Sequence, residues 1–266
     1  MRGKRWKHVL KGTFLSSASA LILGYALSFL GLWESLEYDT WAWRVKLLAE
    51  PGPASGSIAL ILIDQASLDW GRRENSWPWP WPREVYSAII NFCRRGGAKA
   101  IVLDLLFSEP SWAGEDDDLR LGEALRGGGE FLKGAPSVVG LFLGESTEQA
   151  NRWPVEVPKP PWKIEGLQEY LKENPGVPFE LSHAAFPVLP IARAASCLAN
   201  VREAPGEEGV LSKVTLFQGF AGFTVPSLGI APFLIVKGRL SLILQEGKIF
   251  IGDRQIPVDR LCLIHI

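Results

Sequence analysis

The chain begins with a basic tail, residues 1–11, followed by a long apolar stretch. Residues 12–33 carry no charged side chain. A helix of this length extends about 33 Å, slightly more than the roughly 30 Å hydrocarbon core of a bilayer. The pattern therefore predicts a retained transmembrane helix. A cleaved signal peptide is disfavoured, because the apolar stretch before the Ala18–Ala20 pattern is too short for one.

Charges on either side of this segment predict its orientation. Five basic residues lie in the first eleven, whereas Glu34, Glu37 and Asp39 follow the apolar stretch. Because basic residues are retained in the cytoplasm, we expect the tail inside the cell and the body outside the cytoplasm. Helical character continues through residues 34–50, which predicts a stalk helix ending before a proline.

Small residues recur at every fourth position of the apolar segment, from Gly12 to Ser28. Such a stripe lets a second helix approach closely, so we expect a homodimer formed through the membrane helices. The alternative interpretation is the ordinary composition of membrane helices, in which glycine, alanine and serine are common.

In the body, residues 51–266, short apolar runs alternate with helical periodicity in the first half. The order strand–helix–strand–helix–strand predicts an α/β fold with a largely parallel sheet flanked by helices. The expected elements are a strand over 58–64, a helix over 82–93, a strand over 98–107, a helix over 116–125 and a strand over 137–144.

The second half is less regular. Residues 145–187 are polar and proline-rich, and predict a surface excursion with one short helix over 167–172. The expected elements beyond it are a helix over 189–198, a strand over 209–217, a helix over 223–238, a C-terminal β-hairpin over 240–259 that turns at Glu246-Gly247, and a strand over 261–266. The apolar last strand has no polar tail after it, so we expect a domain that is C-terminally incomplete.

Composition excludes several classes of function. The formal net charge is −1, and with five of the 28 basic residues in the tail the body is acidic, which argues against nucleic-acid binding. Cys93, Cys197 and Cys262 are too dispersed for a zinc site, and the sequence does not decide which two could form a disulfide. There is no GxSxG motif and no P-loop. We therefore expect no catalytic residue, metal or cofactor.

Two aspartates are the first candidates for a ligand site. Asp64 and Asp104 each lie near the carboxyl end of a predicted parallel strand, the edge at which open α/β sheets bind ligands. Ser67 adds a hydroxyl group and Arg83 a positive charge. The favoured alternative is structural: both acids cap turns and pair with Arg83 or Lys99.

A tryptophan–proline ladder over residues 77–82 supplies the aromatic candidates. Each proline fixes its own φ and disfavours a helical conformation in the preceding tryptophan, so the ladder is expected to be extended. Trp79 and Trp81 are candidates for the aromatic wall of a ligand site. The favoured alternative is a stiff lid over the core.

The acidic run over residues 115–118 begins a predicted helix. A cation site is one interpretation of this run. Solvated acids at a helix N-terminus are favoured, because carboxylates stabilise that end of the helix dipole.

Taken together, these segments resemble a known family, the second type of CHASE domain. The specific part is WPWPREVYSAIINFCRRGGAKAIVLDLLFSEPS, preceded by EYDTWAWRVK and ILIDQASLD and followed by EDDDLRLGEAL. Looser agreement continues through ARAASCLANV, GVLSKVTLF, VPSLGIAPFL and IPVDRLCLI. The resemblance covers most of Glu37 to Ile266.

The resemblance implies an extracytoplasmic sensor held in the bacterial inner membrane by an N-terminal helix. In the family, further membrane helices and a cytoplasmic cyclase or kinase follow, and neither is found before Ile266. We therefore expect a sensory domain for an unknown ligand, with no catalysis of its own. The rival expectations are an extracytoplasmic hydrolase or transferase that uses Asp64 and Asp104, and a non-catalytic envelope protein that binds a partner through the tryptophan ladder.

Overall fold

The computed structural model divides the chain into two units, residues 1–66 and 67–266, and each is described by itself. The residues that the structure describes are 17, 19, 21–25, 40, 43–48, 50, 52, 54–127, 134–146, 149–202, 214–238 and 240–258.

The first unit contains helical residues at 21–25 and 43–48, and a 3-10 helix, η1, at Ser55–Ser57. Most of the predicted membrane helix over 12–33 and of the predicted stalk over 34–50 lies outside the described residues. Within the described part of the chain, no helix combines the length and the apolar character needed to cross a bilayer.

The prediction of a strand over residues 58–64 is wrong. The segment has no regular secondary structure, and Leu60 is 79% exposed. Its apolar residues favour an extended conformation, but a strand forms only where a neighbour pairs with its backbone N–H and C=O groups. No described strand pairs with this segment.

The second unit is built around a parallel sheet whose central strand is β2, Ser137–Gly144. Two strands pair in parallel with β2. They are β1, at Ile101–Leu103, and β6, at Cys197–Asn200. A short strand, β5 at His183–Ala185, pairs antiparallel with the end of β2. Nearly every residue of β2 is buried, as expected for a strand covered on both faces.

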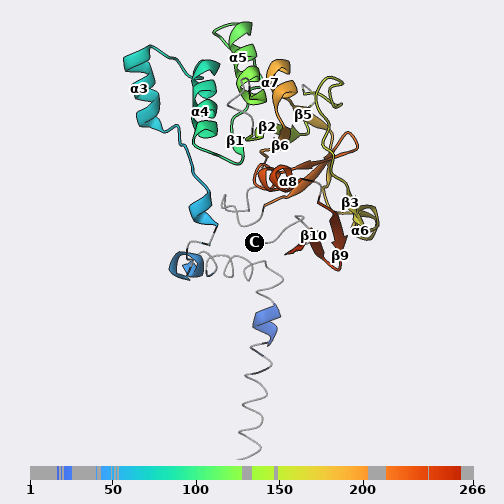
Figure 1. Cartoon of the computed structure of the whole chain (residues 1–266). Helices are drawn as coiled ribbons and strands as arrows, with labels where there is room; N and C mark the ends of the chain where they lie inside the picture. Colours follow the sequence, from blue (N-terminus) through green and yellow to red (C-terminus); the bar gives the residue numbers. More distant parts are fainter. Residues whose placement is uncertain are drawn as a thin grey trace, which may run out of the picture. The chain divides into compact units, whose positions relative to one another are not determined.

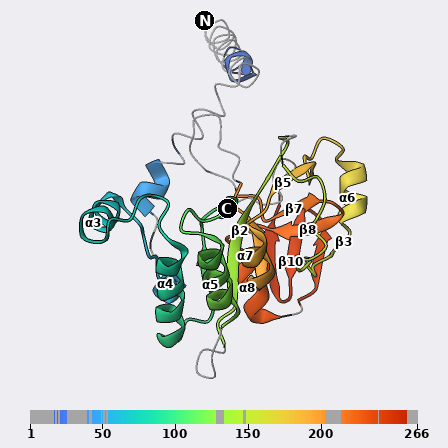
Figure 2. The same cartoon turned by 90° about the horizontal axis from the view of Figure 1, so that it is seen from above.

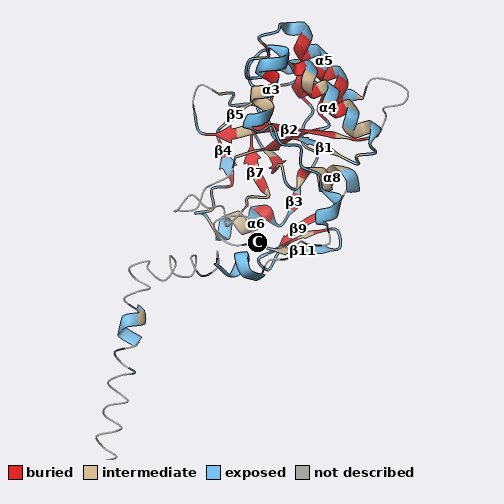
Figure 3. Cartoon of the chain, turned by 90° about the vertical axis from the view of Figure 1, so that its left-hand side faces the viewer, coloured by how far each residue is buried: buried red, intermediate tan, exposed pale blue. Residues whose placement is uncertain are grey.

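Helices cover both faces of this sheet (Figures 1 and 3). On one face lie α4, Arg83–Arg95, α5, Glu115–Arg126, and α7, Leu189–Ala194. Figure 2 shows them side by side with α5 in the middle. On the other face lies α8, Ala231–Lys237, which contacts β2 and β6. The predicted parallel sheet flanked by helices is thus confirmed, as are the helices α4 and α5. Helix α3, Gln65–Asn75, precedes α4.

A second sheet lies at the far side of α8. It has the order β11-β10-β9-β3, and the antiparallel pair β9 and β10 confirms the predicted hairpin at Glu246-Gly247. Helix α6, Leu167–Glu173, confirms the short helix predicted in the polar stretch. The strands of this sheet are β3 at Ile164–Glu165, β9 at Leu242–Gln245, β10 at Lys248–Ile251 and β11 at Arg254–Pro257.

A third sheet has the order β4-β7-β8, and two of its strands correct the predictions. Its strands are β4 at Glu180–Leu181, β7 at Phe217–Phe220 and β8 at Phe223–Pro226. The helix predicted over 223–238 therefore begins only with α8, because β7 supplies a pairing partner for residues 223–226.

The other corrections have the same cause. The helix predicted over 189–198 ends at Ala194, since Cys197 and Leu198 pair with β2. The stretch 145–187 includes β3, β4 and β5 rather than a helix alone. Most of the strand predicted over 209–217, and the whole of the one over 261–266, lies outside the described residues.

Two clusters of buried residues lie on the α8 side of the parallel sheet, and Trp162 packs against both. The smaller one joins β2 and β6 to α8. The larger one fills the space between the second sheet, α6 and α8. The side chain of Trp162 therefore lies where the two cores meet. The smaller cluster consists of Val138, Cys197, Ala199 and Ala231.

Candidate functional site

The tryptophan–proline ladder connects α3 to α4 and bends at Trp79-Pro80, whose peptide bond is cis. The ring of Trp77 lies edge-on to that of Trp70 in α3 and to that of Trp81, with centroids 5.9 Å apart in each case. Trp81 is 6% exposed and Trp79 is 52% exposed. Of the two candidate tryptophans, Trp81 is thus part of the core, whereas Trp79 faces solvent.

Helix α3 packs on Trp81 through its only buried residue, Gly71. A Cβ atom at Gly71 would lie 2.8 Å from Nε1 of Trp81, well inside van der Waals contact. The helix reaches the indole only because this position lacks a side chain. Gly71 and Trp81 therefore set the register between α3 and the ladder.

Arg83, the first residue of α4, is buried in a network of partners. Its Nε lies 3.0 Å from Oδ1 of Asp118, and the two side chains are 5% and 4% exposed. Its Nη2 donates to the backbone oxygen of Glu109 at 2.8 Å, and its guanidinium lies 4.7 Å from the ring centroid of Phe107. The charge that the sequence suggested for a ligand is balanced by Asp118.

Asp117 caps the start of α4. Pro82 occupies the N-cap position and provides no side-chain hydrogen bond to the helix. Instead, the backbone N–H of Arg83 donates to Oδ2 of Asp117 at 2.6 Å, and that of Glu84 donates to Oδ1 at 3.0 Å. The Ser111 hydroxyl also donates to Oδ2, at 2.6 Å. Asp117 and Asp118 of the acidic run are thus buried structural groups, and the expectation of solvated acids is wrong for these two residues.

One signal in the sequence could have indicated this cap. Helix α4 begins with Arg-Glu after the N-cap Pro82, and its N-cap position lacks the serine, threonine or aspartate that commonly accepts from the first N–H groups. Those donors therefore needed an acceptor from elsewhere in the chain. We name Gly71, Trp81, Arg83, Asp117 and Asp118 the tryptophan–arginine junction.

The remaining candidate residues lie outside the junction. Asp104 directly follows β1, as predicted, and is exposed, but Arg83 pairs with Asp118 and not with it. Asp64 belongs to the first unit and is exposed, and Ser67 is a half-buried residue of α3. Trp112, which the sequence did not suggest, is half-exposed and donates from Nε1 to the backbone oxygen of Pro80 at 2.7 Å.

Arg94 fixes the other end of α4. Its guanidinium donates to the backbone oxygens of Ala124 and Leu125 at the end of α5, and to Oγ of Ser137 at the start of β2. A cation at the C-terminal carbonyls of a helix is favourable. Burial lowers the pKa of Arg94. On the same helix, burial raises the pKa of Tyr86, although the nearby charge of Arg83 opposes this shift.

This arrangement favours a structural role for the junction. Arg83, Asp117 and Asp118 all form hydrogen bonds within the protein, and the two carboxylates are held by backbone N–H groups and by arginine. Among the described residues, no cluster of histidine, cysteine, aspartate and glutamate could hold a metal ion. Cys93 and Cys197 are free thiols, while Cys262 lies outside the described residues. The junction joins α3, α4 and α5.

Comparison with known proteins assigns the chain to a family. The family model for the CHASE2 domain matches residues 17–264 and so covers most of the chain, including the junction. No curated protein and no solved structure matches it. CHASE2 domains are extracellular sensory domains of signalling receptors. The chain therefore belongs to the CHASE2 domain family.

Proposed function

We propose that this chain is the extracytoplasmic sensory domain of a bacterial membrane signal-transduction receptor. It senses a ligand outside the cytoplasm and passes the signal to a cytoplasmic cyclase or kinase output domain. The family match over residues 17–264 carries this proposal. Because CHASE2 domains are sensory rather than catalytic, we do not propose the acid–base role for Asp64 and Asp104.

The uncharged segment 12–33 anchors the receptor in the inner membrane. Its length suits a bilayer, and the basic tail before it favours an orientation with the tail in the cytoplasm. Residues 34–50 form the stalk, and the body from residue 51 onwards lies outside the cytoplasm.

The signal passes through α3 and the tryptophan–arginine junction. Helix α3 follows the N-terminal segment in the chain, and its Gly71 lies against Trp81 without space for a side chain. Trp81 is two residues from Arg83, whose ion pair with Asp118 joins α4 to α5. Since packed interfaces are not continuously deformable, a shift of α3 requires a second discrete packing at Trp81. A ligand drives such a shift only by binding one packing more tightly than the other.

The receptor works as a homodimer that meets through the small-residue stripe of residues 12–28. Replacing Ala20 and Gly24 by leucine is expected to abolish dimer formation and signalling while the body stays folded. Chemical cross-linking in membranes and the output of a chimeric receptor measure the two effects. Unchanged cross-linking would contradict the dimer.

Topology tests the proposal most directly. The full chain, expressed in a Gram-negative bacterium, is expected in the inner-membrane fraction. Protease added to spheroplasts should degrade the body, because the body faces the outside of that membrane. Deleting residues 12–33 together with the basic tail should leave the body in the cytoplasm and protected. A protected body in the full chain, or one found in the soluble fraction, would contradict the proposed function.

A further inference from the structure

The extended segment at residues 58–64 leaves an apolar surface uncovered in the single chain. Its first six residues are all apolar, and Ile58, Leu60 and Leu62 are 67%, 79% and 73% exposed. A run of more than three or four exposed apolar residues is unusual in a protein surface that meets no partner. No described strand pairs with the backbone of this segment. The segment therefore needs a partner that covers apolar side chains and also pairs with backbone groups.

A lipid surface meets only the first of these needs. The segment follows the predicted membrane anchor, but hydrocarbon offers neither donors nor acceptors to an extended backbone, and unsatisfied groups cost free energy there. The unpaired edge of a β-sheet supplies both apolar neighbours and backbone groups. A sheet edge is therefore the partner that this segment fits.

Strand β1 provides such an edge in the second unit. It pairs with β2 on one side, and among the described strands it has no neighbour on the other. Its central residue, Val102, is 39% exposed, although Ile101 and Leu103 beside it are buried. One further strand can therefore join the sheet here. Parallel pairing would continue the arrangement that β2 makes with β1 and β6, and a segment that is apolar on both faces is typical of a parallel strand.

The helices above this edge form a wider row than the strands below them. Packed helices lie about 8–10 Å apart and neighbouring strands about 4.8 Å apart, so α4, α5 and α7 extend beyond β1, β2 and β6. Figures 1 and 2 show α4 at the outer end of the helix row, on the β1 side of the sheet. Along α4, Val85, Ile89 and Phe92 recur at helical spacing; the first two are half-buried and Phe92 is 67% exposed. A strand added beside β1 would help to cover this stripe.

A second copy of the chain fits this edge better than the chain's own segment does. Asp64 joins α3 without a loop, and the contact of Gly71 with Trp81 fixes α3 on the junction. Pairing of the segment with its own β1 would therefore require α3 to change its packing. In the proposed homodimer, the contact of the membrane helices holds the segment of one copy near the body of the other, which raises its effective concentration.

We propose that residues 58–64 of each copy pair as a parallel edge strand with β1 of the second copy. The exchange is reciprocal, as expected for a dimer with twofold symmetry. It rests on the proposed contact of the membrane helices, because seven residues per copy form too small an interface to hold two copies alone. The exchange joins the segment that follows the stalk of one copy to the central sheet of the other.

Disulfide cross-linking between two differently tagged full-length copies tests the proposal. The background is Cys93→Ser with Cys262→Ser, which leaves only the buried Cys197. One copy carries Val102→Cys, and the other carries one cysteine in the segment, from Leu60→Cys, Ile61→Cys, Leu62→Cys or Ile63→Cys. The pair is purified through both tags and oxidised. We expect a covalent dimer with both tags, at least about fivefold stronger at alternate positions of the segment, since successive side chains of a strand face opposite sides.

Two variants separate strand pairing from loose contact. Val155→Cys, at a position that is 92% exposed and outside β1, replaces Val102→Cys and should give no covalent dimer with both tags above background. Phe92→Ser removes the most exposed member of the stripe on α4. It should reduce the cross-link about threefold while the chain stays folded, because less apolar surface is covered by the exchange.

Three results would overturn the proposal. Equal cross-linking at neighbouring positions would indicate loose apolar contact. Absence of the cross-link, or of a pair that carries both tags, would leave the segment to another occupant such as a lipid surface. A disulfide within one chain, formed when Val102→Cys and the strongest segment cysteine are combined in the same copy, would assign the segment to its own β1. A failed topology experiment would instead contradict the sensory function and leave this cross-link valid.

Discussion

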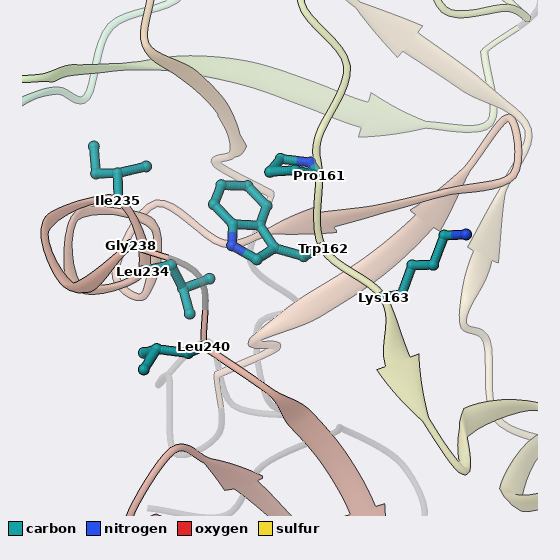
Figure 4. A pocket seen from close by; sticks show the side chains of 7 residues that line it. All are labelled: Pro161, Trp162, Lys163, Leu234, Ile235, Gly238 and Leu240. Atoms are coloured by element: carbon teal, nitrogen blue, oxygen red, sulfur yellow. The ribbon is translucent and has the colours of Figure 1, made fainter.

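The tryptophan–arginine junction and the surroundings of Trp162 both place an indole where elements of structure meet, but their packing differs. At the junction, Arg83 is paired, Asp117 accepts three hydrogen bonds, and Trp81 fills the space over Gly71. Trp162, by contrast, lies beside a hollow of about 550 Å³ between α8 and the segment before β3, which Lys163, Leu234 and Ile235 also line (Figure 4). The more distinctive motif of the sequence thus forms a closed joint, and the less distinctive one lines an open hollow.

The largest expected effect comes from breaking the buried ion pair of the junction. Arg83→Met should lower the free energy of unfolding by about 3–5 kcal/mol, because it leaves the Asp118 carboxylate buried without its partner. Denaturant unfolding of the full chain measures the change. If Arg83 were instead available to a ligand, the loss would be small.

Two variants control for this effect. Arg120→Ala breaks the exposed pair with Glu84, and should cost at most about 1 kcal/mol. The double variant Arg83→Met with Asp118→Leu should recover much of the stability, since it removes both buried charges. A double variant as unstable as Arg83→Met would show that the loss has another origin.

The next largest effect is loss of the cap on α4. Asp117→Ala should destabilise the chain by about 2 kcal/mol, because two backbone N–H groups and the Ser111 hydroxyl lose their acceptor. Asp116→Ala, at the exposed neighbouring position, should change the stability by less than about 0.5 kcal/mol. Equal losses in the two variants would contradict a specific cap.

A smaller effect is expected at the contact between α3 and the ladder. Gly71→Ala should destabilise by about 1 kcal/mol: the clash with Trp81 costs about 1–3 kcal/mol, and higher helix propensity offsets part of it. Gly229→Ala, where a Cβ would meet nothing within 4 Å, is the matched control. In the double variant of Gly71→Ala and Trp81→Phe, the change in the free energy of unfolding should differ from the sum of the two single changes. Strict additivity would argue against direct contact.

The smallest expected effect concerns the reactivity of the Cys197 thiol. Cys197 belongs to the smaller of the two buried clusters against which Trp162 packs. Burial raises the pKa of this thiol to about 12, so at pH 8 it is protonated and unreactive. In a Cys93→Ser, Cys262→Ser variant, iodoacetamide should alkylate Cys197 only after denaturant is added. Rapid alkylation of the folded chain would contradict the burial of Cys197 in this cluster.

The sequence predicted those elements whose signal is local. Strand β2 was identified with its bounds because an apolar run ends at Gly144, and α4 because of its periodicity and the glycines after it. The segment 58–64 shows the limit of this reasoning: its residues favour a strand, but pairing depends on a neighbour that the local sequence does not specify.

The candidate site was less predictable, because its contacts are between residues far apart in the chain. Asp118 lies 35 positions after Arg83, and only the folded chain shows that they pair and that Asp117 caps α4. Asp104 was correctly expected to follow a strand, yet nothing local indicated that Arg83 is bonded elsewhere. Trp162 lies in a proline-rich stretch without periodicity, so no pattern distinguished it from other surface residues.

Hydrogen exchange of the two indole N–H groups tests the contrast between the two regions most directly. Trp81 is buried at the junction, whereas Trp162 is half-buried beside the hollow. Buried groups exchange only when the structure around them opens. We predict that, by NMR of the folded chain, the Nε1 proton of Trp81 exchanges with deuterium much more slowly than that of Trp162. Equal exchange rates, or faster exchange at Trp81, would contradict the account.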